Sequence, residues 1–468
     1  MAVLVAGEAN VPSITYPVVI VGGGACGLTA ALAVRDAGIA VLVIERDPTP
    51  RGTTAMSTGL IPAAGTPDQA AQGIEDRPEL LAHDIIAKTK HRTDPDVALH
   101  LAKESAETVM WLRTAHGVPL TLVDGFTYPG HSVRRMMGTP HRTGEELMAA
   151  LNDACALAGV DVLTDATVRD LIVTCVGGDT RVTAVVIDRP DGTIETVGTG
   201  AVILACCGFG GNPDMLRTHI PEIADAVFHG HAGNKGDAVR WGQALGAGIA
   251  DMGAYQGHGG LAAGYAIPIL WPVIVEGGFQ VNTAGERFSN EALGYSEQAA
   301  KVNAQPSGVA WSIFDTRIDG VMRQFDDYQQ ALSAGAVVKC ATIDDLARAT
   351  GIPRDQLAAT LDEVERYTVT GKTDRWGRCF AGKAPLDAPY LTAKVTGALF
   401  HTQGGLIVDR DARVLKTDGT PFANLFAGGG AARGISGPDA TGYIAGNGLL
   451  TATTFGKLAG RAAAEMVR

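Results

Sequence analysis

The sequence predicts an α/β fold in which a discontinuous nucleotide-binding domain encloses an inserted α+β domain. Three observations support this prediction. A glycine-rich turn joins two apolar, strand-length segments between residues 17 and 45, and from residue 391 the chain returns to short apolar segments and glycine-rich loops. The stretch 254–385 differs, because it mixes glycine loops with polar helices. We therefore expect a nucleotide-binding domain formed by residues 14–253 and 386–468, with a cap or substrate domain at 254–385.

Composition and charge narrow the class of protein. The chain has 468 residues, which at roughly 100–200 residues per domain suggests two or three units. Its net charge of −12 and the lack of a basic stripe argue against a nucleic-acid partner. No apolar segment approaches the roughly 18 residues of a membrane span, and the N-terminus lacks the pattern of a signal peptide.

Cysteine and histidine spacing gives no sign of a metal centre. The seven cysteines include no CxxC pair, which argues against a disulfide framework or a zinc ribbon. His229 and His231 form an HGH triplet, but no further cluster of ligands accompanies them. We therefore expect a cytoplasmic protein that binds no metal and has no transmembrane segment.

Residues 17–45 have the pattern of a strand, a tight turn, a helix and a second strand. The turn reads GxGxxG, with Gly22, Gly24 and Gly27 at its glycine positions. Gly22 allows the turn, Gly24 lets the backbone approach a pyrophosphate, and Gly27 lets the helix pack closely. The helix N-terminus offers N–H groups to the phosphates, and Glu45 ends the second strand, where it can accept ribose hydroxyls. This pattern predicts a Rossmann-like dinucleotide-binding domain.

The remaining elements follow from apolar periodicity and from glycines at helix ends. Helices are expected at 79–117, 142–159, 343–349, 354–368 and from 448, and strands at 161–176, 181–187, 201–205, 405–409 and 425–428.

Five motifs carry a resemblance to a known family. They are GGGACG (22–27), GERFSNEALGY (285–295), HTQGGLIVD (401–409), LFAGGG (425–430) and YIAGNGLLTATTFG (443–456). With these motifs the sequence resembles the succinate dehydrogenase/fumarate reductase flavoprotein family over nearly its whole length. Within that family it is most similar to the 3-ketosteroid Δ1-dehydrogenase branch.

The resemblance favours FAD over NAD as the bound dinucleotide. Residues 51–65 (RGTTAMSTGLIPAAG) look like the loop that runs along the pyrophosphate and flavin in this family. The family motifs imply FAD contacts from Gly22, Gly24, Ala25, Cys26, Gly27, Glu45, Arg46, Thr53, Thr54, Ser57, Gly59, Val168, Cys206, Gly208, Asp237, Gly429, Gly430, Gly448, Leu449 and Leu450. Two departures stand out: Cys206-Cys207 replaces Thr-Gly of the family's LATGGF stretch, and Gly430 replaces Glu or Asn.

Two tyrosines carry the similarity to the ketosteroid branch. Fumarate reductases have a catalytic arginine at the position of Tyr295 and a substrate-clamping arginine at that of Tyr443, whereas ketosteroid dehydrogenases have tyrosine at both. A dicarboxylate needs cationic forks to bind it. Two phenols suit a neutral ketone, so we expect a 3-ketosteroid or a smaller cyclic ketone as substrate.

The resemblance implies an α,β-dehydrogenation. Tyr443 and the N–H of Gly446 donate to the ketone oxygen and stabilise the developing enolate. Tyr295 takes the α-proton as phenolate, the β-hydrogen leaves as hydride to the flavin, and an external acceptor such as a quinone or dye reoxidises the flavin. Because a tyrosine titrates near pH 10, Tyr295 needs a hydrogen-bonding neighbour, for which Tyr128 is a candidate.

Other readings stay open. His258 and His401 match histidines that fumarate reductases place near the substrate, whereas the ketosteroid branch differs there. A reductase of fumarate or of a neutral enone is therefore the first alternative. An oxidase of amino acids or small acids and a non-catalytic electron-transfer flavoprotein are the others. Tyr295 could also be a packed tyrosine of the cap domain.

Overall fold

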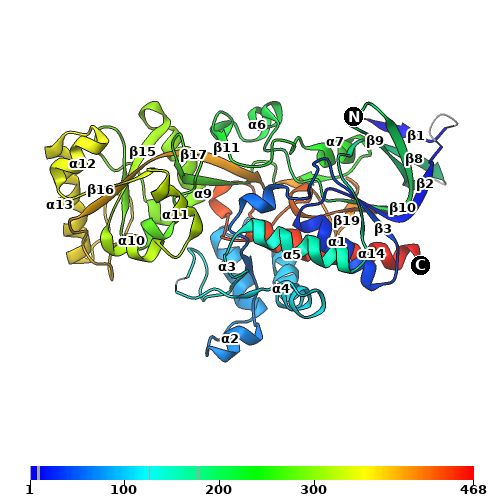
Figure 1. Cartoon of the computed structure of the whole chain (residues 1–468), viewed down its shortest axis with the longest axis horizontal. Helices are drawn as coiled ribbons and strands as arrows, with labels where there is room; N and C mark the ends of the chain where they lie inside the picture. The colour runs from blue at the N-terminus through cyan, green and yellow to red at the C-terminus, as the bar shows by residue number, and fades with distance from the viewer. Residues whose placement is uncertain (1, 8–10, 126, 177–178) are drawn as a thin grey trace. The chain divides into compact units, whose positions relative to one another are not determined.

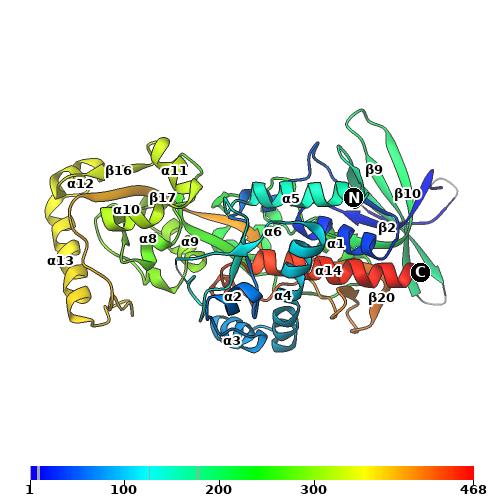
Figure 2. The same ribbon diagram turned by 60° about the horizontal axis from the view of Figure 1, so that its bottom comes forward.

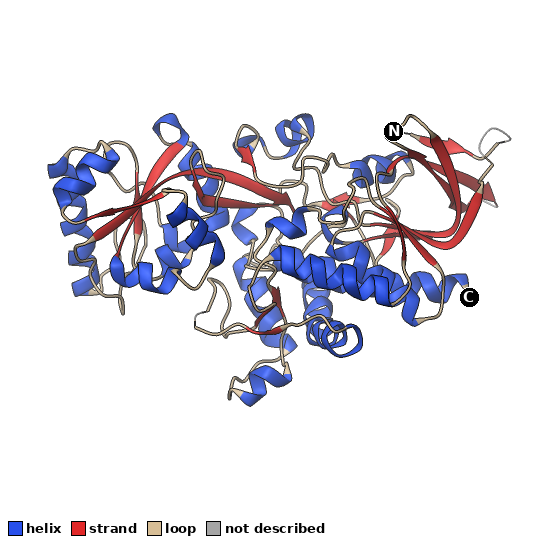
Figure 3. Cartoon of the chain, in the orientation of Figure 1, coloured by secondary structure: helices blue, strands red, loops and turns tan. Residues whose placement is uncertain are grey.

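The computed structural model of the chain describes residues 2–7, 11–125, 127–176 and 179–468 (Figure 1). It divides into two compact units. Unit 1 comprises Met1–His219, Gly230–Tyr255 and His401–Arg468, and unit 2 comprises Ile220–His229 and Gln256–Phe400. Both units combine helices with strands (Figure 3), which confirms the predicted α/β class.

Unit 1 is built on a nine-stranded sheet of order β1-β8-β9-β10-β2-β3-β7, with β20 also pairing with β10 and β19 with β20. The strands are β1 (Val3–Val5), β2 (Ile14–Val21), β3 (Val41–Ile44), β7 (Asp161–Leu163), β8 (Thr167–Val176), β9 (Asp179–Asp188), β10 (Ile194–Leu204), β19 (Arg413–Leu415) and β20 (Pro421–Ala427). Strand β10 has two roles, because it pairs antiparallel with β9 and then runs parallel to β2 and β20. The paired residues 18–21 of β2, 41–44 of β3 and 201–204 of β10 are all buried and apolar, as expected for parallel strands covered on both faces.

Three helices of unit 1 lie side by side along this sheet (Figure 2): α5 (Gly144–Leu157), α1 (Ala25–Asp36) and α14 (Asn447–Val467). Small residues let α1 and α14 approach closely. A Cβ at Gly460 would lie only 2.3 Å from the carbonyl oxygen of Ala30, so no side chain fits there. The two ends of the chain therefore meet in one domain.

A smaller part of unit 1 supports the loop that leads to Arg135. It holds the helices α3 (Pro78–Lys88) and α4 (Pro95–His116) and a sheet of order β4-β6-β5, whose strands are Ile61–Pro62, Met136–Gly138 and Thr121–Leu122. Helix α4 is capped by the Asp94 side chain and ends at Gly117, whose φ of 69° suits glycine.

Unit 2 is built around a six-stranded sheet of order β11-β17-β15-β14, in which β13 and β16 also pair with β17. Its strands are β11 (Val227–Phe228), β13 (Tyr255–Ala262), β14 (Phe279–Val281), β15 (Val309–Asp315), β16 (Val337–Cys340) and β17 (Tyr390–Thr402). Among its helices are α9 (Tyr295–Asn303), α10 (Thr316–Met322), α12 (Ile343–Thr350) and α13 (Arg354–Thr370). Phe279, Ile313 and Leu357 are fully buried in its core.

Strand pairing explains the residues at which the two units divide. Strand β17 pairs with β15 from Tyr390 to Thr396, so the chain as far as Phe400 stays with unit 2. Residues 220–229 join unit 2 because β11 pairs with β17. At the other end, β1 pairs with β8, so the first residues belong to unit 1 although the expected domain began at 14. In the described part of the chain, no helix has the length and apolar character needed to cross a membrane.

Candidate cofactor and substrate site

A groove opens in unit 1 where its central parallel strands end. Val21 and Gly22 border it at the end of β2, Ile44 at the end of β3 and Ala205 beyond β10. In open α/β sheets, ligand pockets lie outside the carboxyl ends of the strands. The groove therefore lies where such a fold binds a nucleotide.

Most of the predicted cofactor residues line this groove. They are Gly22, Gly24, Ala25, Cys26, Glu45, Arg46, Thr53, Thr54, Val168, Cys206, Asp237, Gly429 and Gly430.

The other predicted cofactor residues lie outside its lining: Gly27, Ser57, Gly59, Gly208, Gly448, Leu449 and Leu450. Packing explains several of them. A Cβ at Gly27 would lie 1.9 Å from the oxygen of Gly22, and one at Gly208 would lie 2.0 Å from Thr402 Oγ1. Ser57 shapes the loop by donating to the oxygen of Thr54 at 2.7 Å. These residues support the backbone around the groove.

Several lining residues have no counterpart in the prediction. His231, Asn234 and Trp241 come from the segment before and within α7 (Asp237–Ala244). Thr53 holds this segment, because its Oγ1 accepts from the N–H of His231 at 3.2 Å and from Asn234 Nδ2 at 2.8 Å. The only local signal was the neighbouring Gly236-Asp237 pair.

The N-terminus of α1 forms a cradle for an anion. Its N-cap, Gly24, has no capping side chain, and the first turn holds no acidic residue. The N–H of Ala25 donates to Thr54 Oγ1 at 3.3 Å, and the other N–H groups of this turn can serve an anionic ligand. Glu45 is buried beside it, with Oε2 accepting from the N–H of Gly23 at 2.7 Å and Oε1 from that of Asp47 at 3.0 Å. The N–H groups at the start of α1 suit a phosphate, and the Glu45 carboxylate suits ribose hydroxyls.

Two orphaned polar atoms also point to a ligand. Asp237 Oδ1 and Trp241 Nε1 are buried in the groove without a hydrogen-bond partner among the described residues. Buried polar groups in native proteins are almost always paired. Burial raises the pKa of Asp237, against the opposing effect of Arg46, whose Nη2 lies 3.5 Å from Oδ2. The groove therefore presents the mixed acceptors and donors that a dinucleotide requires.

Three thiols line the groove, from Cys26, Cys206 and Cys207. Burial raises the pKa of each thiol, and that of Cys206 reaches about 12. A thiol is a poor nucleophile until it is ionised. Cys207 also adopts a φ of 64°, and its Sγ lies 3.0 Å from the place that a Cβ at Gly430 would occupy. These cysteines therefore form part of the wall of the groove, and we do not expect them to act as nucleophiles.

His401, Tyr443, Gly446 and Gly448 gather at the N-terminus of α14 in unit 1. The rings of His401 and Tyr443 meet edge to face with 5.7 Å between their centroids. Gly448 lies beneath the imidazole, where a Cβ would come within 2.8 Å of the ring. Gly446 is the N-cap of α14, with a φ of 81° that suits glycine.

A chain of side chains holds the ring of His401. His401 Nδ1 lies 3.0 Å from Gln403 Nε2 and 3.4 Å from the backbone oxygen of Thr402. Gln403 Oε1 accepts from Ser436 Oγ at 2.9 Å, and Ser436 Oγ in turn accepts from Asn447 Nδ2 at 3.2 Å. Burial, opposed by the contact with Thr402, lowers the pKa of this histidine to about 4, so the ring is neutral.

In unit 2 an aromatic group surrounds the other predicted catalytic residues. His258 is stacked between Tyr295, the first residue of α9, and Phe400, with 5.2 Å between ring centroids on each side. Trp271 meets His258 edge-on at 5.7 Å. Burial, with a smaller contribution from His229, lowers the pKa of His258 to about 3. Tyr295 therefore lies among aromatic rings and beside a neutral histidine.

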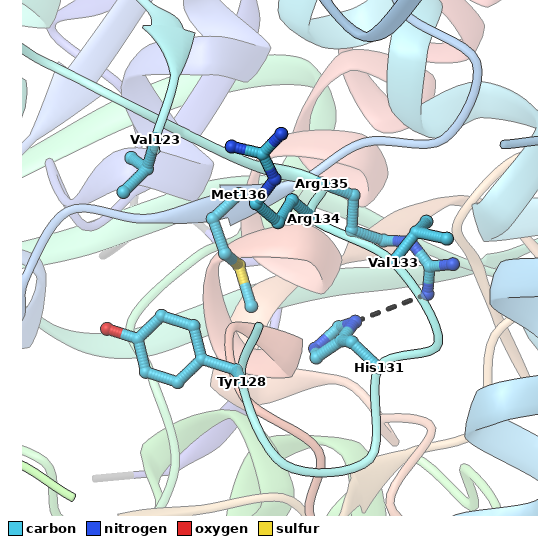
Figure 4. A pocket seen from close by; sticks show the side chains of 7 residues that line it. All are labelled: Val123, Tyr128, His131, Val133, Arg134, Arg135 and Met136. Atoms are coloured by element: carbon cyan, nitrogen blue, oxygen red, sulfur yellow. Dashed lines mark hydrogen bonds between the residues drawn. The ribbon is translucent and has the colours of Figure 1, made fainter. Parts of the chain in front are cut away.

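Tyr128 lies in unit 1, in a small pocket that it lines together with His131, Arg135 and Met136 (Figure 4). The two histidines of the HGH triplet belong to different units. His229 packs on Phe400 in unit 2, whereas His231 pairs with Asp47 at 2.6 Å in unit 1. Across the described ranges, no group of three His, Cys, Asp or Glu side chains could hold a metal ion.

Comparison with known proteins agrees with these features. The model of the family described as "FAD binding domain" matches residues 17–449. A probable fumarate reductase of Shewanella frigidimarina is 29% identical over 460 residues, covering 97% of this chain and 76% of its own. Among solved structures, the open form of a flavocytochrome c3 fumarate reductase has a TM-score of 0.81 at 28% identity, covering 97% of this chain and 79% of that one. A 3-ketosteroid-Δ4-(5α)-dehydrogenase from Rhodococcus jostii has the same fold, with a TM-score of 0.76 at 24% identity over 98% of this chain and 99% of that one.

The groove has a glycine turn, an anion cradle and buried polar atoms without partners, as an FAD site requires. The family match covers all of these residues and most of the sequence. The chain belongs to the FAD binding domain family, within the succinate dehydrogenase/fumarate reductase flavoproteins, and is an FAD-dependent oxidoreductase.

Proposed function

We propose that the chain is a dehydrogenase that forms a double bond α,β to a ketone, with a 3-ketosteroid or a smaller cyclic ketone as substrate. The observation that carries the proposal is the pair of phenols, Tyr295 and Tyr443, at the positions where fumarate reductases have arginines. The histidine beside each of them is neutral, since burial lowers the pKa of His401 beside Tyr443 to about 4 and that of His258 beside Tyr295 to about 3. Such groups favour a neutral carbonyl over a dicarboxylate.

The residues of unit 1 would polarise the ketone. The hydroxyl of Tyr443 and the N–H of Gly446 donate to its oxygen, at the positive end of the α14 dipole. As negative charge develops on that oxygen, a donor of this kind contributes about 3–4 kcal/mol. His401, which burial keeps neutral, packs edge to face against Tyr443 at the same helix end.

Tyr295 of unit 2 would take the proton from the α-carbon. Bound FAD supplies the two-electron acceptor for the hydrogen that leaves the β-carbon as hydride. The substrate therefore loses one proton and one hydride and gains a carbon–carbon double bond. A quinone-like or dye-like external acceptor then removes the two electrons from the enzyme.

Reduction of a neutral activated alkene is the second candidate. The observation that favours it is the 29% identity to a probable fumarate reductase. The same residues would then work in the opposite direction, with Tyr295 giving a proton and Tyr443 polarising the conjugated carbonyl. Fumarate itself fits poorly, because a phenol cannot supply the bidentate donors that an arginine offers a carboxylate.

An anaerobic titration of the purified yellow protein separates these candidates. Androstenedione, a cyclohexanone derivative and succinate are added in turn while the visible absorbance of the oxidised flavin is followed. We expect a ketone to bleach the flavin and succinate to leave it unchanged. Bleaching by succinate would overturn the proposal. If the dithionite-reduced protein is reoxidised by cyclohexenone while no ketone reduces the oxidised form, the reductase is the correct function, and peroxide formed in air identifies an oxidase.

A further inference from the structure

A buried arginine stands behind the loop that holds Tyr443 and Gly446. Arg135 is fully buried and makes a bidentate pair with Asp76, from Nε to Oδ2 and from Nη2 to Oδ1, both at 3.0 Å. Its Nη1 reaches Asp84 Oδ2 at 2.5 Å. The N–H and hydroxyl of Ser132 also donate to Asp84. Two carboxylates thus fix the guanidinium in one orientation.

The same guanidinium determines the tautomer of His131. Arg135 Nη1 lies 3.2 Å from His131 Nδ1, as the dashed line in Figure 4 shows. A guanidinium can only donate, so Nδ1 must be the acceptor and the histidine proton must reside on Nε2. Nε2 then donates to the backbone oxygen of Ala445 at 3.0 Å. Burial and the charge of Arg135 lower the pKa of His131 to about 4, so the ring stays neutral.

The carbonyl of Ala445 belongs to the same peptide group as the N–H of Gly446. In a planar trans peptide these two bonds point in opposite directions. A hydrogen bond that holds the oxygen therefore also fixes the direction of the N–H. Without it this peptide could rotate, because Gly446 has no side chain and adopts a left-handed φ of 81°. Among the hydrogen bonds of the described residues, the Gly446 oxygen accepts from Leu450 and the Gly446 N–H has no acceptor.

We propose that His131 is a positioning residue that aims the Gly446 N–H at the carbonyl oxygen of the substrate. Arg135 in turn keeps His131 in the tautomer that can do so. The inference rests on the proposed function, which assigns the Gly446 N–H to that oxygen. A buried arginine with two carboxylates is a costly means of stabilising a fold, and such a network is well suited to holding a neutral donor in one geometry.

The test uses the FAD-loaded full chain with three substitutions. His131→Leu removes the donor at similar volume, and His131→Gln keeps an amide N–H near the Nε2 position. His83→Leu, at an exposed position of α3, is the control. Flavin affinity and melting temperature verify that each variant is folded. The readouts are kcat and KM for the ketone that bleaches the wild type, and the 19F NMR shift of bound 4-fluorophenol, whose phenolate resembles the enolate.

We expect His131→Leu to lower kcat by about 10-fold to 100-fold with KM changed less than about threefold, since the lost contact acts mainly on developing charge. Bound 4-fluorophenol should ionise at a higher pH in this variant, and His131→Gln should recover most of both effects. Unchanged kcat and phenol ionisation in His131→Leu would overturn the inference. So would equal losses in both variants together with weaker flavin binding, because these indicate a purely structural role. A wild type that acts on no ketone and binds no phenolate overturns the proposed function, and the inference with it.

Discussion

The imidazole of His258 lies face to face with the phenol of Tyr295, with 5.2 Å between the ring centroids and 30° between the planes. Phe400 covers the other face of the imidazole at 5.2 Å and 15°. The stack orients the Tyr295 ring through contacts that do not involve its hydroxyl. Phenylalanine at this position would therefore keep the stack and remove only the oxygen.

The first prediction concerns this oxygen. Tyr295→Phe should lower the rate of flavin bleaching by a ketone by roughly 10²–10⁴-fold, the usual effect of losing a proton-transfer group. The flavin spectrum and FAD affinity should be unchanged. Stopped-flow absorbance under anaerobic conditions measures the rate. Tyr265→Phe, at an exposed tyrosine of the same unit, is the matched control. A Tyr295→Phe rate equal to that of the control would rule out proton transfer by Tyr295.

The second prediction concerns pH and stability. Burial lowers the pKa of His131 and His401 to about 4 and that of His258 to about 3. Below pH ~6.5 the unfolded chain protonates these histidines while the folded chain does not. Each should therefore lower the free energy of unfolding by about 1.4 kcal/mol per pH unit as the pH falls from 6.5 towards 4.

Urea denaturation at pH 7, 6 and 5 measures this dependence. His401→Gln should reduce the change in unfolding free energy by about 1.4 kcal/mol per pH unit, the contribution of one histidine. His83→Gln, at an exposed position, should leave the pH dependence of the unfolding free energy as in the wild type. Equal slopes in all three proteins would show that His401 is protonated in the folded state. Because His401 stays neutral in the folded protein, its titration should cause no change in kcat/KM near pH 6.5.

The third prediction concerns the segment that leads into Tyr295. Glu291 is fully buried between Arg287, at 2.8 Å, and Arg378, at 2.9 Å. Burial alone would raise its pKa, but Arg378 and Arg287 hold the pKa at about 2. Glu291→Gln leaves two buried guanidinium groups short of a counter-charge, and should cost about 3–5 kcal/mol of unfolding free energy. Glu286→Gln, at an exposed position of the same motif, should change it by less than about 0.5 kcal/mol. Chemical denaturation of both variants measures the difference, and similar values would contradict this account.

The fourth prediction concerns the glycine turn. Alanine at position 27 would place its Cβ 1.9 Å from the oxygen of Gly22, so α1 must shift away from the phosphate cradle. Gly27→Ala should therefore purify without the visible absorbance of FAD. Gly320→Ala, where a Cβ meets no atom within 4 Å, should retain it. The ratio of absorbance near 450 nm to that at 280 nm gives the result, and a fully loaded Gly27→Ala variant would show that this packing is dispensable.

Local patterns predicted the part of the site that is built locally. Gly22, Gly24 and Glu45 line the groove because a strand, a turn and a helix within thirty or so residues determine their geometry. Tyr295 and Tyr443 were identified through resemblance, since neither position carries a signal of its own. Gly27 was expected to let the helix pack closely, and a Cβ there would lie 1.9 Å from the oxygen of Gly22. Its contact with FAD stays a prediction.

The rest depended on contacts between distant segments. His131 and Ala445 are 314 positions apart, so no window of sequence could relate them. Trp241 lines the groove from α7, and the loop before this helix is held by Thr53, which lies far away in the sequence. The extent of unit 2 likewise depends on distant contacts, since β11 and β15 both pair with β17.

Cys207 and Gly430, two departures from the family pattern, lie against each other in the wall of the groove. In the flavoprotein group that the sequence resembles, glycine stands at the first position and Glu or Asn at the second. Here a Cβ at 430 would lie 2.9 Å from the backbone nitrogen of Gly208 and 3.0 Å from the sulfur of Cys207, and Cys207 adopts a φ of 64° that glycine takes more readily. Glycine at 207 would remove the sulfur but not the backbone contact. A side chain at 430 therefore also requires the backbone of residues 207–208 to move.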